Sequence, residues 1–227
     1  MFGKILRVVG IILMALTAVM TLLGGIGTTC VALDAAKYGD SMAALADYQW
    51  LYMLYVLAGI VLAIAGLHAT RLLIKSRANA YRMAMIVLVS GMVVGIIHML
   101  TSRALRGSSM PVDFIVYITA FTLVVFLLFR IPGIWQKVNL TGKDDHTTGM
   151  GAGVAMIVAG FIILTVQVWG GAMHTINGVN YADVWHTQLA LAGSAVLLAG
   201  SIVLLRKVLG VSLPRPSQVT VAKEVIR

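Results

Sequence analysis

The sequence predicts an all-α integral membrane protein, a bundle of six transmembrane helices with both termini in the cytoplasm. Three observations lead to this fold class. Hydrophobic residues make up 60% of the 227 residues, and the mean hydropathy is +0.97. Six apolar stretches are each about as long as a membrane-spanning helix. Lys and Arg flank most of these stretches on one side, as the positive-inside rule requires.

The predicted spans follow one another along almost the whole chain. They cover residues 5–28, 51–73, 83–100, 112–129, 151–173 and 187–205. At 1.5 Å per residue each can cross a hydrocarbon layer about 30 Å thick, or nearly so. We expect helices because backbone amides in lipid must be satisfied within the segment, and none of these stretches shows the two-residue alternation of a barrel strand.

The distribution of cations predicts the orientation. If the N-terminus is cytoplasmic, the same side of the membrane carries all of the 17 Lys and Arg residues except three. The exceptions are Lys37, Arg103 and Arg106. This asymmetry places both termini inside. It also explains the net charge of +9 through contacts with membrane lipids, so we expect no nucleic-acid partner. A prokaryotic inner membrane is the expected location.

The loops divide the chain into four parts. Residues 1–130 form a four-helix membrane part, 131–148 a cytoplasmic hinge loop, 149–206 a C-terminal transmembrane hairpin, and 207–227 a cytoplasmic tail. Pro132 and the polar run after it favour a break between the two membrane parts. The connection that precedes the second span is long enough for a short interfacial helix at 42–45.

The first and last hairpins are weakly similar in sequence. Three pairs of segments correspond: 23–25 with 169–171, 57–66 with 191–200, and 46–47 with 182–183. Duplication would make the two hairpins similarly packed helix pairs, although small-residue spacing arises readily in membrane helices. Gly91 and Gly95 in the third span are interpreted as a packing face that lets a neighbouring backbone approach closely.

Histidines are the residues that suggest chemistry. His98 lies near the outer end of the third span, and His174 and His186 flank the outer loop of the last hairpin. A b-type haem needs two imidazoles at one depth and cations for its propionates. His98 with His174, or with His186 as substitute, could supply the first, and Arg103 or Arg106 the second. A quinone near the outer face is the other cofactor expected there.

A metal site is an alternative use of the same residues. Asp183, His186, His174 and His98 offer one carboxylate and three imidazoles, which suits copper, zinc or non-haem iron. Their spacing matches no motif of fixed geometry. Other enzyme signatures are absent from the sequence, including nucleophile elbows, zinc-protease helices and phosphate loops. Every Asp and Glu lies in a loop or at a span boundary, which disfavours ion-coupled transport.

The sequence therefore favours a non-catalytic, membrane-embedded subunit of a larger electron-transfer or energy-transducing complex. It would anchor partner subunits and hold one b-type haem or quinone near the outer face. The general shape is similar to that of small cytochrome-b-like membrane anchors, whose pattern of four placed histidines is missing here. Alternatives are a structural or assembly subunit without a cofactor, a passive transporter, and a metal-dependent membrane enzyme.

Overall fold

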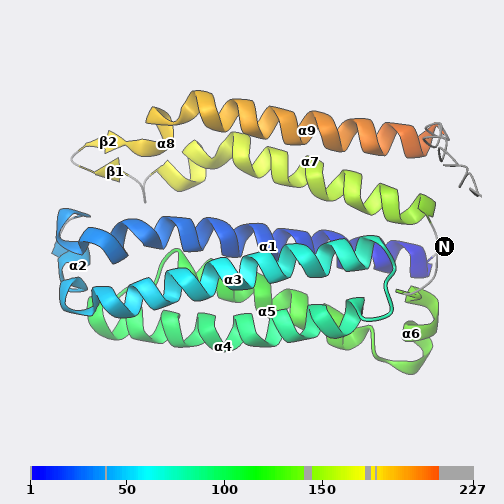
Figure 1. Ribbon diagram of the computed structural model, residues 1–227, viewed down its shortest axis with the longest axis horizontal. Coiled ribbons are helices and arrows are strands. Elements are labelled where there is room, and N and C mark those ends of the chain that lie inside the picture. The colour runs from blue at the N-terminus through cyan, green and yellow to red at the C-terminus, as the bar shows by residue number, and fades with distance from the viewer. Residues whose placement is uncertain (1, 39, 141–144, 172–174, 177, 210–227) are drawn as a thin grey trace, which may run out of the picture.

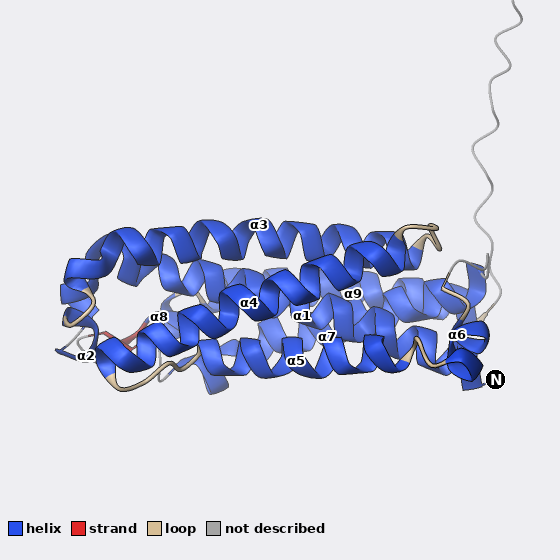
Figure 2. Cartoon of the chain, turned by 90° about the horizontal axis from the view of Figure 1, so that it is seen from below, coloured by secondary structure: helices blue, strands red, loops and turns tan. Residues whose placement is uncertain are grey.

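Long helices that run side by side make up most of the molecule (Figures 1 and 2). The computed structural model describes residues 2–38, 40–140, 145–171, 175–176 and 178–209. The long helices are α1 (Phe2–Asp34), α3 (Gln49–Ile74), α4 (Ala80–Arg106), α5 (Val112–Leu128), α7 (Asp145–Gly170) and α9 (His186–Val208). The short elements are η1 (Ala35–Tyr38), α2 (Asp40–Ala43), η2 (Ala46–Tyr48), α6 (Pro132–Val138), β1 (Thr175–Ile176), β2 (Val179–Asn180) and α8 (Tyr181–Val184).

The helical membrane bundle expected from the sequence is confirmed in its outline. In the described chain, five helices are long and apolar enough to cross a membrane. A sixth span is counted if α5 and α6 are taken together, although they are bent by 99°. Helix α5 alone has 17 residues, close to the lower limit for a span. The bend follows from Pro132 at the start of α6, because the preceding Ile131 takes an extended backbone with ψ of 128°.

The two ends of the bundle differ in charge. The start of α1 and the end of α9 lie at the same end, together with the α3–α4 turn and α6 (Figure 1). We name this the cationic end, because all described Lys and Arg except Lys37, Arg103 and Arg106 belong to the segments gathered there. Those three belong to the opposite end. Separation of the cations by bundle end agrees with the predicted topology, while the side of the membrane that each end faces stays a prediction.

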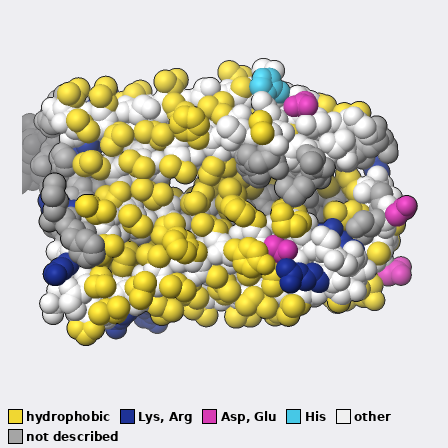
Figure 3. Space-filling view, turned by 180° about the vertical axis from the view of Figure 1, so that it is seen from behind, with side chains coloured by type: hydrophobic (Ala, Val, Ile, Leu, Met, Phe, Trp, Pro, Cys, Tyr) yellow, Lys and Arg dark blue, Asp and Glu magenta, His cyan; other side chains and the backbone are white. Residues whose placement is uncertain are grey.

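Hydrophobic side chains cover the flank of the bundle between its ends (Figure 3). Many of them are large and exposed, such as Val61, Phe121 and Leu191. In water this surface would be unfavourable, since soluble monomers rarely expose large contiguous apolar patches. In lipid it needs no cover, which explains why the long helices bury so few of their side chains.

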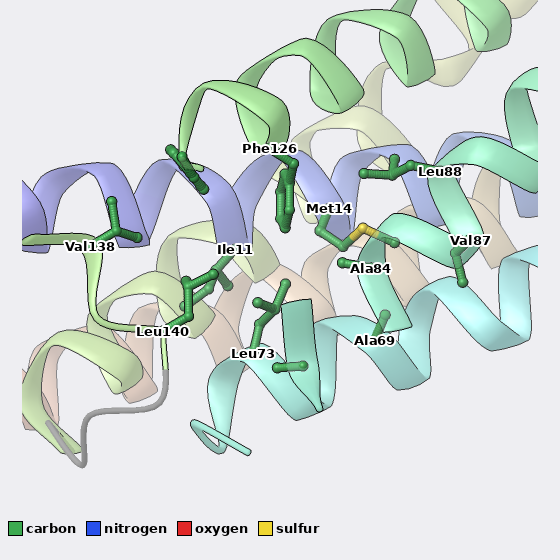
Figure 4. Close-up of a cluster of buried hydrophobic side chains, with 12 residues drawn as sticks. Ile11, Met14, Ala69, Leu73, Ala84, Val87, Leu88, Phe126, Val138 and Leu140 are labelled. Carbon is green, nitrogen blue, oxygen red and sulfur yellow. The ribbon is translucent and has the colours of Figure 1, made fainter. Parts of the chain in front are cut away.

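Four helices form the main body, and a helical hairpin packs on it. Helix α1 contacts α3 and α5, and α4 contacts α3 and α5. The hairpin of α7 and α9 packs on this body mainly through α7, which lies against α1. A buried apolar cluster around Ile11, Leu88 and Phe126 fills the body near the cationic end (Figure 4). Gly107, with φ of 72°, ends α4 in the left-handed conformation that glycine adopts without strain.

Two hairpins, α1–α3 and α7–α9, are packed in the same way. A Cβ atom built on Gly59 would lie 3.5 Å from the Cα of Gly25, and one on Gly66 would lie 2.9 Å from the Cβ of Ala18. In the second hairpin the contacts are as close. A Cβ atom on Gly160 would lie 2.9 Å from the carbonyl oxygen of Gly193.

Gly153 and Gly200 form the second contact of that hairpin. A Cβ atom built on Gly153 would lie 3.0 Å from the carbonyl oxygen of Gly200. On each of the four helices the two small residues are two turns apart, so that they share one face. The matched spacing gives the similarity of 57–66 with 191–200 a structural basis.

The structure corrects another part of that sequence comparison, the correspondence of 23–25 with 169–171. Gly25 packs on Gly59 as Gly160 packs on Gly193, so the counterpart of Gly25 is Gly160. Gly171, which the sequence comparison paired with Gly25, lies instead against the side chain of Asn180. The alignment of 23–25 with 169–171 was therefore wrong, because paired glycines near a helix end occur for more than one packing reason.

Candidate functional site at His98

His98 lies in α4 with its imidazole against two tyrosines of α3. Its ring stacks on Tyr55, with centroids 4.2 Å apart and planes inclined by 16°. Tyr52 meets it edge-on, with centroids 5.4 Å apart. Stacked and edge-to-face pairs are the favourable geometries of such rings. The imidazole is thereby held in one orientation between α3 and α4.

Hydroxyl groups fix the two tyrosines in turn. The hydroxyls of Tyr52 and Ser102 share a hydrogen bond of 2.7 Å, and those of Tyr55 and Thr101 share one of 3.1 Å. Both tyrosines are buried, so these bonds satisfy polar groups that lipid could not. Within the described chain, by contrast, neither ring nitrogen of His98 has a hydrogen-bond partner.

A cavity of about 60 Å³ lies beside this imidazole, between α1, α3, α4 and α5. We refer to it as the His98 cavity. It is lined by Thr21, Gly24, Gly25, Thr28, Tyr55, Gly59, Leu62, Gly91, Val94, Gly95, His98, Val112, Ile115 and Thr119. Glycines from three helices supply much of this wall, and most of them pack closely against neighbouring helices.

The lining is mostly apolar, with polar groups supplied by three threonines, Tyr55 and His98. Thr21, Thr28 and Thr119 donate their hydroxyls to carbonyl oxygens one turn earlier in their own helices, at 2.8, 2.8 and 2.6 Å. Each hydroxyl oxygen keeps lone pairs that can accept a further hydrogen bond. Among the residues that the structure describes, no Lys, Arg, Asp or Glu lines the cavity. The arrangement suits a small neutral molecule that both donates and accepts hydrogen bonds.

The two arginines predicted to neutralise haem propionates have other partners. Arg103 forms an ion pair of 3.0 Å with Asp113 and donates to the Ser109 hydroxyl at 2.8 Å. Arg106 donates to the carbonyl oxygen of Met110 at 2.6 Å. Both contacts hold the turn between α4 and α5 together at the opposite end.

His186 lies in another part of the molecule. Its Nδ1 is 2.8 Å from Oε1 of Gln167, which ties the start of α9 to α7. Asp183 lies exposed on α8, and His174 lies outside the described residues. The structure therefore gives His98 and His186 separate surroundings. In the described part of the chain, no three His, Cys, Asp or Glu side chains gather as a metal-ion site would require.

The surroundings of His98 do not fit a haem. Pockets for cofactor-sized molecules measure about 300–1,000 Å³, whereas the His98 cavity measures about 60 Å³. One face of the imidazole is also covered by Tyr55. The described residues thus give no geometry through which an iron-bound His98 could act, and haem ligation stays a prediction from the sequence.

Sequence reasoning missed Tyr55 and the glycine-lined cavity. From the sequence, Tyr55 was given no role in a site, and Gly91 and Gly95 were interpreted as packing positions. Gly95 does pack, since a Cβ atom there would lie 2.9 Å from Val116. The signal that could have revealed the site was the number of glycines on several spans at the depth of His98.

Comparisons with known proteins add no further constraint. No protein-family model, no curated protein and no solved structure matches this chain.

Proposed function

We propose that the chain is a membrane-embedded subunit of a larger electron-transfer or energy-transducing complex, in which it anchors partner subunits through α9. The observation that supports this best is how little of α9 the chain itself covers. Within the apolar 18-residue stretch of each helix, 11% of the residues are buried in α9, compared with 33% in α1. Helix α9 packs against α7, and α7 joins it to the body.

Comparison of the two hairpins indicates which contact α9 lacks within the described chain. In the first hairpin, α3 packs on α1 through small residues and is also covered by α4. In the second, α9 packs on α7 through the same kind of contact, but no α4-like helix of the described chain packs on it. A helix from a partner subunit in that position would complete a second body of the same type.

The class of complex rests on the composition of the chain. In the described residues, side chains of Asp, Glu, Lys and Arg lie at or near the helix ends, so the midplane lacks the charges that usually drive transport or catalysis in membranes. Such a chain is better suited to hold other subunits in lipid. His98 and His186 at the opposite end are the residues that favour a redox or energy-transducing partner.

In-membrane crosslinking tests the anchoring role. A photo-crosslinking residue at Leu191 or Leu198 on α9 should give adducts with one or two defined proteins in native membranes. Leu57 and Ile64 are the matched controls, because they precede Gly59 and Gly66 of α3 as Leu191 and Leu198 precede Gly193 and Gly200. All four side chains are exposed.

The outcomes separate the possibilities. Protein adducts at the α9 positions and lipid adducts at the α3 positions would support anchoring through α9. Lipid adducts alone at all four positions would contradict it. Identification of the adduct proteins by mass spectrometry would then test the class of complex, since partners with no redox or energy-transducing role would contradict that part of the proposal.

A further inference from the structure

We propose that the His98 cavity binds a cluster of about four water molecules inside the membrane bundle, with the imidazole as their main hydrogen-bonding partner. This site is independent of partner binding through α9, because it lies between α1, α3, α4 and α5. Four observations carry the inference: an imidazole without a hydrogen-bond partner among the described residues, the size of the cavity, the threonine hydroxyls in its otherwise apolar wall, and a series of hydroxyls toward the opposite end.

The imidazole requires a partner. His98 is half-buried in α4 and stacked on Tyr55, and no described residue hydrogen-bonds to its nitrogens. A neutral imidazole carries one donor and one acceptor nitrogen. In a lipid-embedded bundle it is unfavourable to leave both nitrogens without a hydrogen bond, because buried polar groups are nearly always hydrogen-bonded to protein or to ordered water.

The volume of the His98 cavity admits only small ligands. A buried water molecule needs about 10–15 Å³ of this kind of space, so about 60 Å³ is enough for about four of them. A cofactor ring with its substituents or a lipid chain needs more room. An apolar occupant would in addition leave the His98 nitrogens without partners.

The polar groups of the wall match water in type. The hydroxyl oxygens of Thr21, Thr28 and Thr119 can accept, since their protons are given to carbonyls of their own helices. His98 can donate through one nitrogen and accept through the other. Water provides both functions at once, and ordered internal waters commonly make about three hydrogen bonds each. An ion is disfavoured because no charged side chain of the described chain lines the cavity.

Hydroxyl groups continue from this site toward the opposite end. Thr101 and Ser102 follow His98 on α4 within about one turn, and they bond to Tyr55 and Tyr52. Beyond them, Arg103 contacts Ser109 and Asp113. These polar groups extend from the cavity toward the opposite end, whereas the apolar cluster around Ile11 and Phe126 occupies the body near the cationic end.

Hydroxyl-radical footprinting of the full chain in lipid nanodiscs tests the site. X-ray pulses turn bound water into radicals that oxidise adjacent side chains, including side chains that detergent and bulk solvent do not reach. We expect oxidation of Tyr55 and His98, with incorporation of oxygen from pre-equilibrated ¹⁸O water. Absence of oxidation at both residues in the folded protein would overturn the proposal.

Two variants and a control make the test specific. Gly91→Val places carbon in the cavity at a position where a Cβ meets only Thr119, at 3.6 Å. His98→Phe keeps an aromatic ring against Tyr55 but removes both nitrogens. Each should lower Tyr55 oxidation several-fold, while Gly133→Ala, where a Cβ meets nothing within 4 Å, should leave it unchanged.

The remaining outcomes are also decisive. Unchanged Tyr55 oxidation in both folded variants would overturn the proposal. If Gly91→Val fails to fold, His98→Phe alone decides. A quinone or another small molecule extracted in equimolar amount from the purified protein, and lost in His98→Phe, would replace water as the occupant and overturn the proposal as stated.

Discussion

Tyr55 and His98 stack face to face with ring centroids 4.2 Å apart, and this contact joins α3 to α4 beside the cavity. The Tyr55 hydroxyl bonds to Thr101, one turn beyond His98 on the same helix. Helix α4 thus holds both the ring and the hydroxyl of Tyr55. The stack fixes the plane of the imidazole, and with it the directions in which its nitrogens can bond.

The stack and the hydroxyl bond of Tyr55 should be separable by mutation. Tyr55→Phe keeps the ring and should lower the free energy of unfolding by about 0.6 kcal/mol, a typical value for an interhelical hydrogen bond in a membrane. Tyr55→Ala also loses the stack and leaves a cavity, and should cost about 3–5 kcal/mol. Thermal unfolding in a mild detergent measures both. Equal losses would show that the ring contact contributes nothing.

The close packing of α7 on α9 predicts a strong response to small substitutions. Gly160→Ala would place its Cβ atom 2.9 Å from the backbone oxygen of Gly193, so the two helices must separate. We expect a loss of about 1–3 kcal/mol, as for other overpacked sites. Gly133→Ala is the control, because its Cβ would meet no atom within 4 Å. Similar unfolding temperatures for the two variants would contradict the described packing.

A buried hydroxyl pair should couple α1 to α5. The hydroxyls of Thr17 and Thr122 share a hydrogen bond of 2.8 Å, and both residues are buried. Thr17→Val and Thr122→Val should each destabilise the protein, and the double variant should show a coupling of about 0.6 kcal/mol. Strictly additive effects would mean that the bond is not formed. Thr165→Val is a suitable control, since Thr165 bonds within its own helix.

The predicted membrane orientation can be tested by labelling at two exposed lysines, which lie at opposite ends of the bundle. In a Cys30→Ser background, Lys37→Cys should react with a membrane-impermeant maleimide on intact cells. Lys137→Cys should react only after lysis, because the positive-inside rule places the cationic end in the cytoplasm. The reverse pattern would invert the topology without affecting the fold.

Much of the fold could be predicted because lipid imposes simple requirements on sequence. Span 51–73 became α3 (Gln49–Ile74), and span 187–205 became α9 (His186–Val208). The exact ends were less predictable: α1 continues to Asp34, and the predicted loop at 131–148 contains α6. These extensions lie beyond the length that a helix needs to cross the hydrocarbon layer, so hydropathy alone does not mark them.

Sequence by itself determined that the chain forms a bundle of long apolar helices, and the end of the bundle to which each described cation belongs. These properties follow from transfer of whole segments into lipid, which depends on composition and length and hardly on neighbours. Only the tertiary structure decided that Gly25 pairs with Gly59 as Gly160 pairs with Gly193, and that glycines of three helices line a cavity beside His98. Such contacts depend on the rotation and register of packed helices, which side chains from different segments set together.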